Sequence, residues 1–244
     1  MHSRQYALTE GPISKSILLF ALPVLLGNIF QQFYNTFDSW CVGNFIGKDA
    51  LAAVSSSGSL IFMMISLFNG IAMGAGVVIA RYYGAKDYTS MSKAIHTNVA
   101  FGLVSGLALT VVGVVFTPTI LKWMGTPESV LPQSISYFRY YFCGATFTVM
   151  YNIFVGILHA VGDSKHPLYY LIFSSIVNVA LDLLFVAVFR WGVGAAAMAT
   201  TISQGVSATL CCIRLARFDA PYQLKLKQIR FHGKSMLEIV RHGL

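Results

Sequence analysis

The chain has few charged side chains. Only 11% of its 244 residues are Asp, Glu, Lys or Arg, whereas soluble domains carry about a quarter. This shortage excludes an ordinary soluble domain, and the 56% share of hydrophobic residues predicts an integral membrane protein. The net charge of +8 does not predict a nucleic-acid partner, because the basic residues lie in the gaps between apolar runs, as topology determinants do.

Cysteine is also scarce, with Cys41, Cys143, Cys211 and Cys212 as its four occurrences. None of them forms a CxxC pair, and three lie in or beside apolar segments. We therefore interpret them as small packing residues and predict neither a disulfide nor a cysteine metal site.

Long apolar runs dominate the rest of the chain. A bilayer core of about 30 Å needs about 20 helical residues, and six segments reach that length: residues 14–42, 50–80, 94–117, 132–158, 166–189 and 193–214. We predict an all-α membrane protein with a six-helix bundle over 1–215. Residues 216–244 read as a basic, amphipathic connector helix on the membrane surface, followed by the start of a second bundle.

The basic residues also predict an orientation. With the N-terminus inside, only Lys48, Lys122, Arg139 and Arg190 of the 17 Lys and Arg residues fall outside. An excess of basic residues in cytoplasmic loops sets the orientation of membrane helices. We expect a multi-pass protein of the plasma (inner) membrane with both termini in the cytoplasm.

Two acidic residues stand apart from the other seven, which lie in loops, connectors or helix ends. Asp38 and Asp182 lie inside apolar segments, where a charged side chain costs about 2.5–3.5 kcal/mol even on lenient insertion scales. Asn178 precedes Asp182 by one helical turn and shares its helix face. An ionisable residue inside a membrane helix is a functional-site hypothesis.

Counting from the loops brings these residues to one depth. Asp182 lies eight residues before Arg190, and Thr200 lies eight residues after Gly192, which is about 12 Å of helix in each case. Asp38 lies at a similar depth below the turn after the first helix. Two carboxyl groups in one apolar pocket cannot both ionise easily, so we predict that they share one exchangeable H⁺ or Na⁺.

Nearby polar side chains leave alternatives open. Tyr34 lies one turn before Asp38 and either donates a hydrogen bond into the pocket or packs as an ordinary aromatic residue. Asn178 either binds the cation or serves only to hydrogen-bond a neighbouring helix. Thr200 either contributes to the site or bonds only to its own helix carbonyl. Pro23 lies inside the first helix, where it predicts either a hinge or a static kink.

Several stretches resemble the multidrug and toxic compound extrusion (MATE) family. They are PISKSILLFALPVLLGNIFQQFYNTFDSWCVGNFIGKDALAAVS, ARYYGAKD, ILHAVGDSKHP, SSIVNVALDLLF and GVGAAAMATTISQ, in the order found in the family. The resemblance implies the N-terminal six-helix lobe of a twelve-helix antiporter, a connector and the first turns of helix 7. It also implies export of cationic, amphipathic drugs in exchange for Na⁺ or H⁺, with no other cofactor.

The resemblance further implies roles for particular residues. A cation site would contain Asp38, Asn178, Asp182, Thr200 and Tyr34, and, by a looser alignment, the helix 4 tyrosine Tyr137. The proline that bends helix 1 would be Pro23. The C-terminal bundle would be missing, so we expect a truncated chain that needs this bundle in cis or a second copy of itself.

Three other functions fit parts of the sequence. A flippase for lipid-linked precursors has the same broader fold but is expected to carry more basic residues in its cavity. An inactive fragment is the second alternative. An aspartyl intramembrane protease needs Gly-x-Gly-Asp on a helix, and the nearest match, Ala160-Val161-Gly162-Asp163, falls in a predicted loop.

Overall fold

The computed structural model describes the backbone of residues 13–243. Within that range it describes all side chains except those of residues 13, 49, 55–65, 67–69, 71–72 and 243. Arg4, which the orientation argument counts on the inner side, lies outside the described residues.

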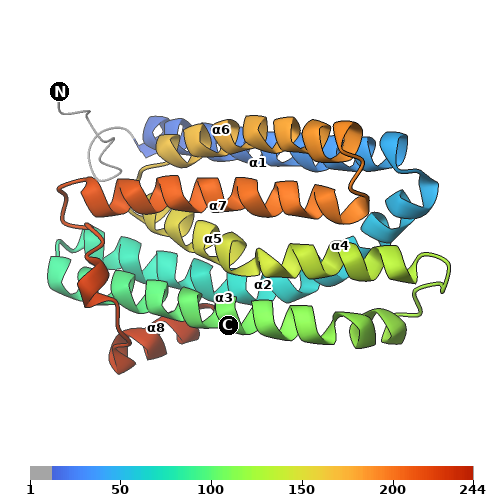
Figure 1. The fold of residues 1–244 in the computed structure, drawn as a ribbon. Coiled ribbons are helices and arrows are strands. Elements are labelled where there is room, and N and C mark those ends of the chain that lie inside the picture. Colours follow the sequence, from blue (N-terminus) through green and yellow to red (C-terminus); the bar gives the residue numbers. More distant parts are fainter. Residues whose placement is uncertain (1–12, 244) are drawn as a thin grey trace.

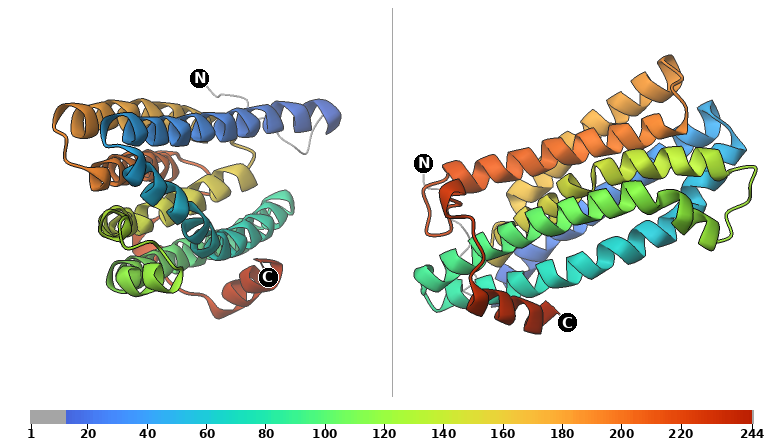
Figure 2. Two further views of the ribbon diagram at one scale, coloured as in Figure 1. Left: turned by 90° about the vertical axis from the view of Figure 1, so that its right-hand side faces the viewer. Right: turned by 60° about the horizontal axis from the view of Figure 1, so that its bottom comes forward.

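The described chain is built from helices that lie along one another. α1 and α6 share one edge of the molecule, α7 lies beside them, α4 and α5 occupy the middle, and α2 and α3 form the opposite edge (Figures 1 and 2). The elements in order are α1 (Ile13–Phe45), α2 (Lys48–Gly84), α3 (Tyr88–Trp123), α4 (Leu131–Cys143), α5 (Ala145–Ala160), α6 (Lys165–Asp182), the π-helix η1 (Leu183–Val188), α7 (Val193–Arg217), the 3₁₀ turn η2 (Leu226–Gln228) and α8 (Gly233–Gly243).

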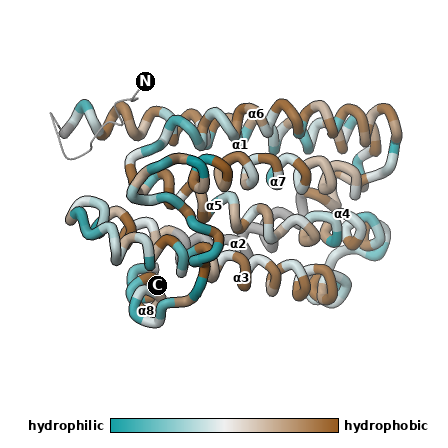
Figure 3. The backbone as a smooth tube through the Cα atoms, turned by 60° about the vertical axis from the view of Figure 1, so that its left-hand side comes forward, coloured by the Kyte–Doolittle hydropathy of each residue, from teal (hydrophilic) through white to brown (hydrophobic). Residues whose placement is uncertain are grey.

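Membrane-spanning length is present in most of these helices. Within the described residues, α1, α3, α6 with its η1 extension, and α7 are each long and apolar enough to cross a bilayer, and the bent pair α4–α5 would make a fifth span. The remaining expected span corresponds to the 37-residue α2, whose middle lies largely among the undescribed side chains. Hydrophilic residues gather at the helix ends and along the connector (Figure 3).

The expected span over 132–158 is present but is not one straight helix, because α4 and α5 meet at Gly144 with a bend of 47°. At the bend the Gly144 N–H donates to the Tyr141 carbonyl (3.0 Å) and not to that of Tyr140. The Tyr140 carbonyl instead accepts a hydrogen bond from the Thr201 hydroxyl of α7 (3.2 Å). A side chain from the neighbouring helix thus satisfies the backbone group that the bend releases, which is how broken helices are tolerated in membranes.

The expected connector helix is also wrong. Between α7 and α8 the chain contains only the three-residue turn η2. The segment is held against the bundle instead: the Leu224 N–H donates to the Leu215 carbonyl (2.9 Å), and the Tyr222 side chain is only 1% exposed. Tyr222 and Leu224 are thus buried against the bundle without a connector helix.

The last described helix, α8, packs beneath α2 (Figure 1). The hydroxyl of Tyr82 donates to a carboxylate oxygen of Glu238 (2.7 Å), and Ile239 is fully buried. The final helical turns are therefore part of the folded body.

Candidate functional site

A polar seam runs between α6 and α7 inside the apolar bundle. α6 contributes Ser174, Asn178 and Asp182, which are spaced by four residues and therefore share one face. α7 contributes a matching buried stripe of Thr200, Ser203, Gln204 and Ser207. The hydroxyls of Ser207 and Ser174 are hydrogen-bonded across the interface.

The third contributor is α1, which brings Asp38 to the seam. The Thr200 hydroxyl donates to Asp38 Oδ2 (2.9 Å), and the same hydroxyl lies 3.1 Å from the Ala196 carbonyl of its own helix. The Asp182 carboxyl is close enough to Asp38 for their charges to interact, and Asn178 also lies beside Asp38. Asp38 of α1, Asn178 and Asp182 of α6 and Thr200 of α7 therefore meet in one place, although Asp38 is at least 140 positions from the others in the sequence.

The cluster is almost closed to solvent within this chain. Asp182 is 0% exposed and Asn178 is 1% exposed, while Asp38 and Thr200 are each 8% exposed. Directly after Asp182 the helix widens into the π-helix η1, a rare geometry that is frequent at functional sites. Periodicity alone gave no indication of this change.

Tyr34 and Tyr137 line the same cluster. Both are buried, and both lie within range of electrostatic interaction with Asp38. Tyr137 comes from α4, just before the bend, and stacks on Tyr141 at a ring distance of 6.3 Å. Tyr137 is buried within range of the charges of both carboxyl groups, and its role in a cation site stays a prediction.

Gln204 is the residue that sequence reasoning missed. Its side-chain N–H donates to the hydroxyl of Tyr34 (3.0 Å), and Gln204 is only 6% exposed. The sequence feature that could have identified Gln204 is its position one helical turn after Thr200, on the polar stripe of α7.

The site also offers oxygen atoms for a ligand. Five buried side-chain oxygens have no hydrogen-bond partner among the described residues: Asp38 Oδ1, Asn178 Oδ1, Asp182 Oδ1 and Oδ2, and Gln204 Oε1. Buried polar atoms are normally paired, so each exception needs an explanation. Carboxylate and amide oxygens are the donors that hard cations prefer, and this donor set fits Na⁺ or a shared proton.

Pro23 is buried inside α1, which continues through it as one helix. It lies fifteen residues before Asp38, or about 22 Å along the helix. Its role as a bending point stays a prediction.

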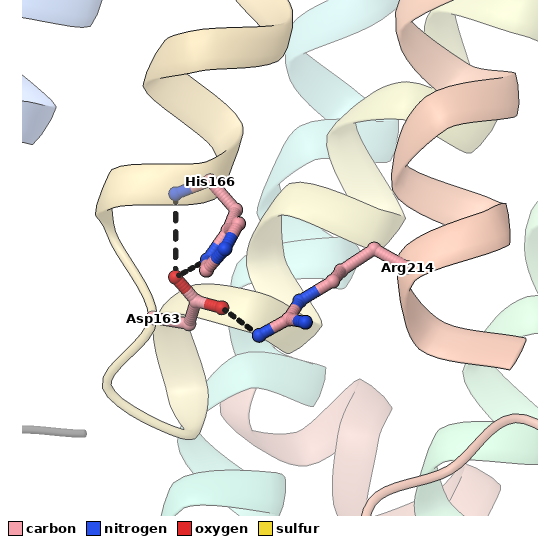
Figure 4. A network of polar contacts seen from close by, with 3 residues as sticks. All are labelled: Asp163, His166 and Arg214. Atoms are coloured by element: carbon pink, nitrogen blue, oxygen red, sulfur yellow. Dashed lines mark hydrogen bonds and ion pairs between the residues drawn. The ribbon is translucent and has the colours of Figure 1, made fainter. Parts of the chain in front are cut away.

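A second polar cluster ties the α5–α6 loop to α7 (Figure 4). Asp163 Oδ1 accepts hydrogen bonds from His166 Nδ1 (2.7 Å) and the His166 backbone N–H (3.3 Å), and Oδ2 lies 3.7 Å from the Arg214 guanidinium. The guanidinium also lies over the Phe218 ring at 3.9 Å. Burial alone would raise the pKa of Asp163, but the hydrogen bonds and charge of His166 and the charge of Arg214 outweigh it and lower this pKa.

The Asp163 cluster gives a stability prediction. We expect Asp163→Asn to lower the free energy of unfolding by about 1.5–3 kcal/mol at neutral pH, the usual worth of hydrogen bonds to a charged group. A lowered carboxyl pKa stabilises the folded state above the ordinary carboxyl range, and this contribution is lost as the pH falls through the lowered pKa. Thermal unfolding of the purified chains in detergent should therefore show that the difference in stability between wild type and Asp163→Asn shrinks below about pH 4. Asp219→Asn, on the exposed connector, is the matched control, and an equal effect of both changes would contradict the prediction.

Asp163 also bears on the protease alternative. It lies in the loop before α6, nineteen residues from Asp182, or roughly 28 Å along a helix. It is engaged in the loop cluster, so the nearest match to the protease motif does not meet the two membrane aspartates.

Long apolar helices around a closed acidic cluster define a helical membrane protein of the transporter class. Comparison with known proteins specifies the family. The MatE family model matches residues 23–184, and the chain belongs to this family.

Relatives and solved structures agree with this assignment. The chain is 35% identical to the probable multidrug resistance protein YoeA of Bacillus subtilis over 95% of this chain and 51% of YoeA. It is 32% identical to the probable multidrug resistance protein YpnP of the same organism, over 84% of this chain and 46% of YpnP. Crystal structures of MATE in the bent and the straight conformation each match with a TM-score of 0.90 and 25% identity, over 100% of this chain and 54% of the MATE chain.

These matches confirm the all-helical membrane fold as half of a MATE transporter structure. The chain spans about half the length of the curated relatives it matches.

Proposed function

We propose that this chain is the N-terminal lobe of a secondary active efflux transporter, which exports cationic, amphipathic drugs in exchange for Na⁺ or H⁺. The coupling cation binds at Asp38 and Asp182, with Asn178, Thr200 and Tyr34 around it and Tyr137 on the α4 side. The proposal rests on one observation: two adjacent carboxyl groups in an apolar bundle have three buried oxygens without partners, and the amide oxygen of Asn178 beside them also has none. The names of YoeA and YpnP as probable multidrug resistance proteins support drugs as the substrate class.

The coupling mechanism follows from the charges. When neither carboxyl group holds a cation, their mutual repulsion in an apolar site disfavours close approach of α1 and α6. A bound Na⁺ or proton removes that repulsion and allows the helices to pack closely. A ligand shifts a conformational equilibrium only by its different affinity for the two states, and here the separation of the carboxyl groups supplies that difference. We propose that α1 repacks about Pro23 in this step.

The proposal includes a location and a partner. The N-terminal ends of α1, α3 and α6 lie at the same end of the bundle as the C-terminal ends of α2, α5 and α7 (Figure 1). We propose that this basic end faces the cytoplasm in the plasma membrane, with residues 1–215 as the bundle and 216–244 as the connector and start of the next helix. A C-terminal six-helix bundle, in cis or as a second copy of this chain, would complete the transporter.

A transport assay tests this function. Cells that express the complete transporter, in which a C-terminal six-helix bundle or a second copy of this chain accompanies this lobe, should accumulate less ethidium, a fluorescent hydrophobic cation, than cells with an empty vector. Imposing an inward Na⁺ gradient or an inward H⁺ gradient separately should accelerate efflux with only one of the two ions. Equal accumulation in both kinds of cell would contradict the proposal.

A further inference from the structure

A basic cavity lies between the first turns of α3 and the connector, away from the acidic cluster. Its volume is about 520 Å³, within the usual range of small-molecule sites. The cavity is lined by three basic residues and three residues with hydroxyl groups. They are Lys93, Lys227 and Arg230, and Tyr88, Thr89 and Ser92. The connector segment and the start of α3 lie at the same end of the bundle in Figures 1 and 2.

Two partly buried hydrogen bonds hold the walls of this cavity in place. The Lys225 backbone N–H donates to Nε2 of His96 (3.1 Å), and the other ring nitrogen of His96 lies 2.6 Å from the Ser92 carbonyl. This arrangement requires the tautomer with the proton on Nδ1. The His232 backbone N–H donates to the Thr97 hydroxyl (3.2 Å). The connector is therefore fixed to α3 on both sides of the cavity.

The basic side chains of the cavity form no ion pair with a described carboxylate. Among the described residues, no carboxylate lies within ion-pairing distance of Lys93, Lys227 or Arg230, and none lines the cavity. Asp87, whose charge reaches Lys93, caps α3 by accepting from the Ser90 N–H (3.1 Å).

The positive charges of the cavity also affect His232, which lies beside them. Its pKa is lowered, first by loss of solvent and then by the charges of Arg230 and Lys93. Arg230 also donates from Nε to Nε2 of the His232 ring (3.2 Å), which orients the guanidinium along the connector.

These features match the chemistry of a phosphate group. Guanidinium, ammonium and hydroxyl donors converging on one cavity are the usual means by which proteins bind phosphate oxygens. Two apolar side chains of the connector, Leu226 and Phe231, are 63% and 51% exposed and adjoin Lys227 and Arg230 in the sequence. At the end of a membrane bundle, exposed apolar side chains beside a basic cavity suit a ligand that has both an anionic head and acyl chains.

We propose that this cavity binds the phosphate headgroup of an anionic membrane phospholipid, with Leu226 and Phe231 against its acyl chains. Bound lipid would bridge α3 and the connector. It would thereby fix the segment that leads from the first bundle into α8.

Native mass spectrometry of the full chain in detergent tests the proposal, with short-chain phosphatidylglycerol and phosphatidylcholine as probes. The test variant is Lys93→Gln/Lys227→Gln/Arg230→Gln. The matched control is Lys225→Gln/Arg217→Gln/Lys234→Gln, which removes the same charge from exposed positions outside the cavity lining. Thermal unfolding of both variants serves to check that they are folded. All three test positions lie at exposed or half-buried sites.

We expect the wild-type chain and the control variant to retain phosphatidylglycerol in preference to phosphatidylcholine. The cavity variant should bind phosphatidylglycerol about a hundredfold more weakly, because each basic residue near an anionic headgroup contributes several-fold to affinity. Equal retention by wild type and cavity variant would overturn the proposal, and so would an equal loss in both variants, which indicates diffuse charge attraction.

A competition arm distinguishes the two sources of phosphate. Inorganic phosphate at millimolar concentration should leave phosphatidylglycerol bound if the acyl contacts matter. Displacement of the lipid by inorganic phosphate, with the loss of phosphate binding in the cavity variant, would assign the site to a free phosphate compound and overturn the lipid assignment. The double variant Leu226→Ser/Phe231→Ser should weaken the binding of phosphatidylglycerol and leave the binding of inorganic phosphate unchanged.

Discussion

Replacing Asp182 with asparagine is expected to abolish drug efflux while the chain still inserts into the membrane normally. The change keeps the size of the side chain but removes the charge that we propose holds the coupling cation. Asp182 is fully buried, and the carboxyl group beside it is Asp38. One remaining carboxylate cannot reproduce the repulsion that we propose separates α1 from α6 in the cation-free state.

Ethidium accumulation in cells that express the intact transporter, with its second bundle, measures the effect, and the amount of protein in the membrane fraction is the check on insertion. The matched control is Asp219→Asn, which makes the same chemical change at an exposed position on the connector. Normal efflux in the Asp182→Asn cells would dismiss the role of this residue. Thr200→Val, which removes only the hydroxyl bonded to Asp38, should reduce efflux without abolishing it.

The second large effect is expected at Gly144, where Gly144→Ala should destabilise the bundle by about 1–3 kcal/mol, as overpacking does. A methyl group there would lie 2.8 Å from Thr201 Cβ, which is close to the backbone and cannot turn away. The backbone conformation of Gly144, with φ −92°, suits any residue, so lack of space is the cause. Gly144→Val should be more damaging.

Thermal unfolding in detergent measures this loss, and Gly84→Ala is the control because nothing lies within 4 Å of the methyl group that it adds. We expect the control to leave the unfolding temperature unchanged or slightly higher, since alanine restricts the unfolded chain more than glycine does. Equal unfolding temperatures for Gly144→Ala and wild type would show that α7 moves aside at this point.

The sequence was most informative where the physics is local. Apolar runs interrupted by charged loops predict spanning helices because lipid leaves backbone polar groups no other partner. Counting residues from the loops at Arg190 and Gly192 predicted that Asp182 and Thr200 lie at one depth, and the structure places both beside Asp38. That count uses only the helical rise, so it needs no knowledge of packing.

The sequence was least informative where one helix responds to another. The bend at Gly144 depends on Thr201, which is 57 positions away, and the extended connector depends on contacts with Leu215 and His96. Gln204 was missed because a single glutamine on a mixed helix face resembles many others until its partner Tyr34 is known. The π-helix after Asp182 carries no periodic signal over its six residues.

The contact at Gly144 also divides the bundle into a fixed part and a movable part. Thr201 fills the space beside Gly144 and donates to the Tyr140 carbonyl, so α7 cannot slide along α4–α5 without losing both contacts. Thr200 is the adjacent residue, and its hydroxyl is therefore held at a constant depth. α1 is different, because only 11% of its spanning window is buried within this chain. We therefore expect a displacement that breaks the Thr200–Asp38 hydrogen bond to involve α1 more than α7.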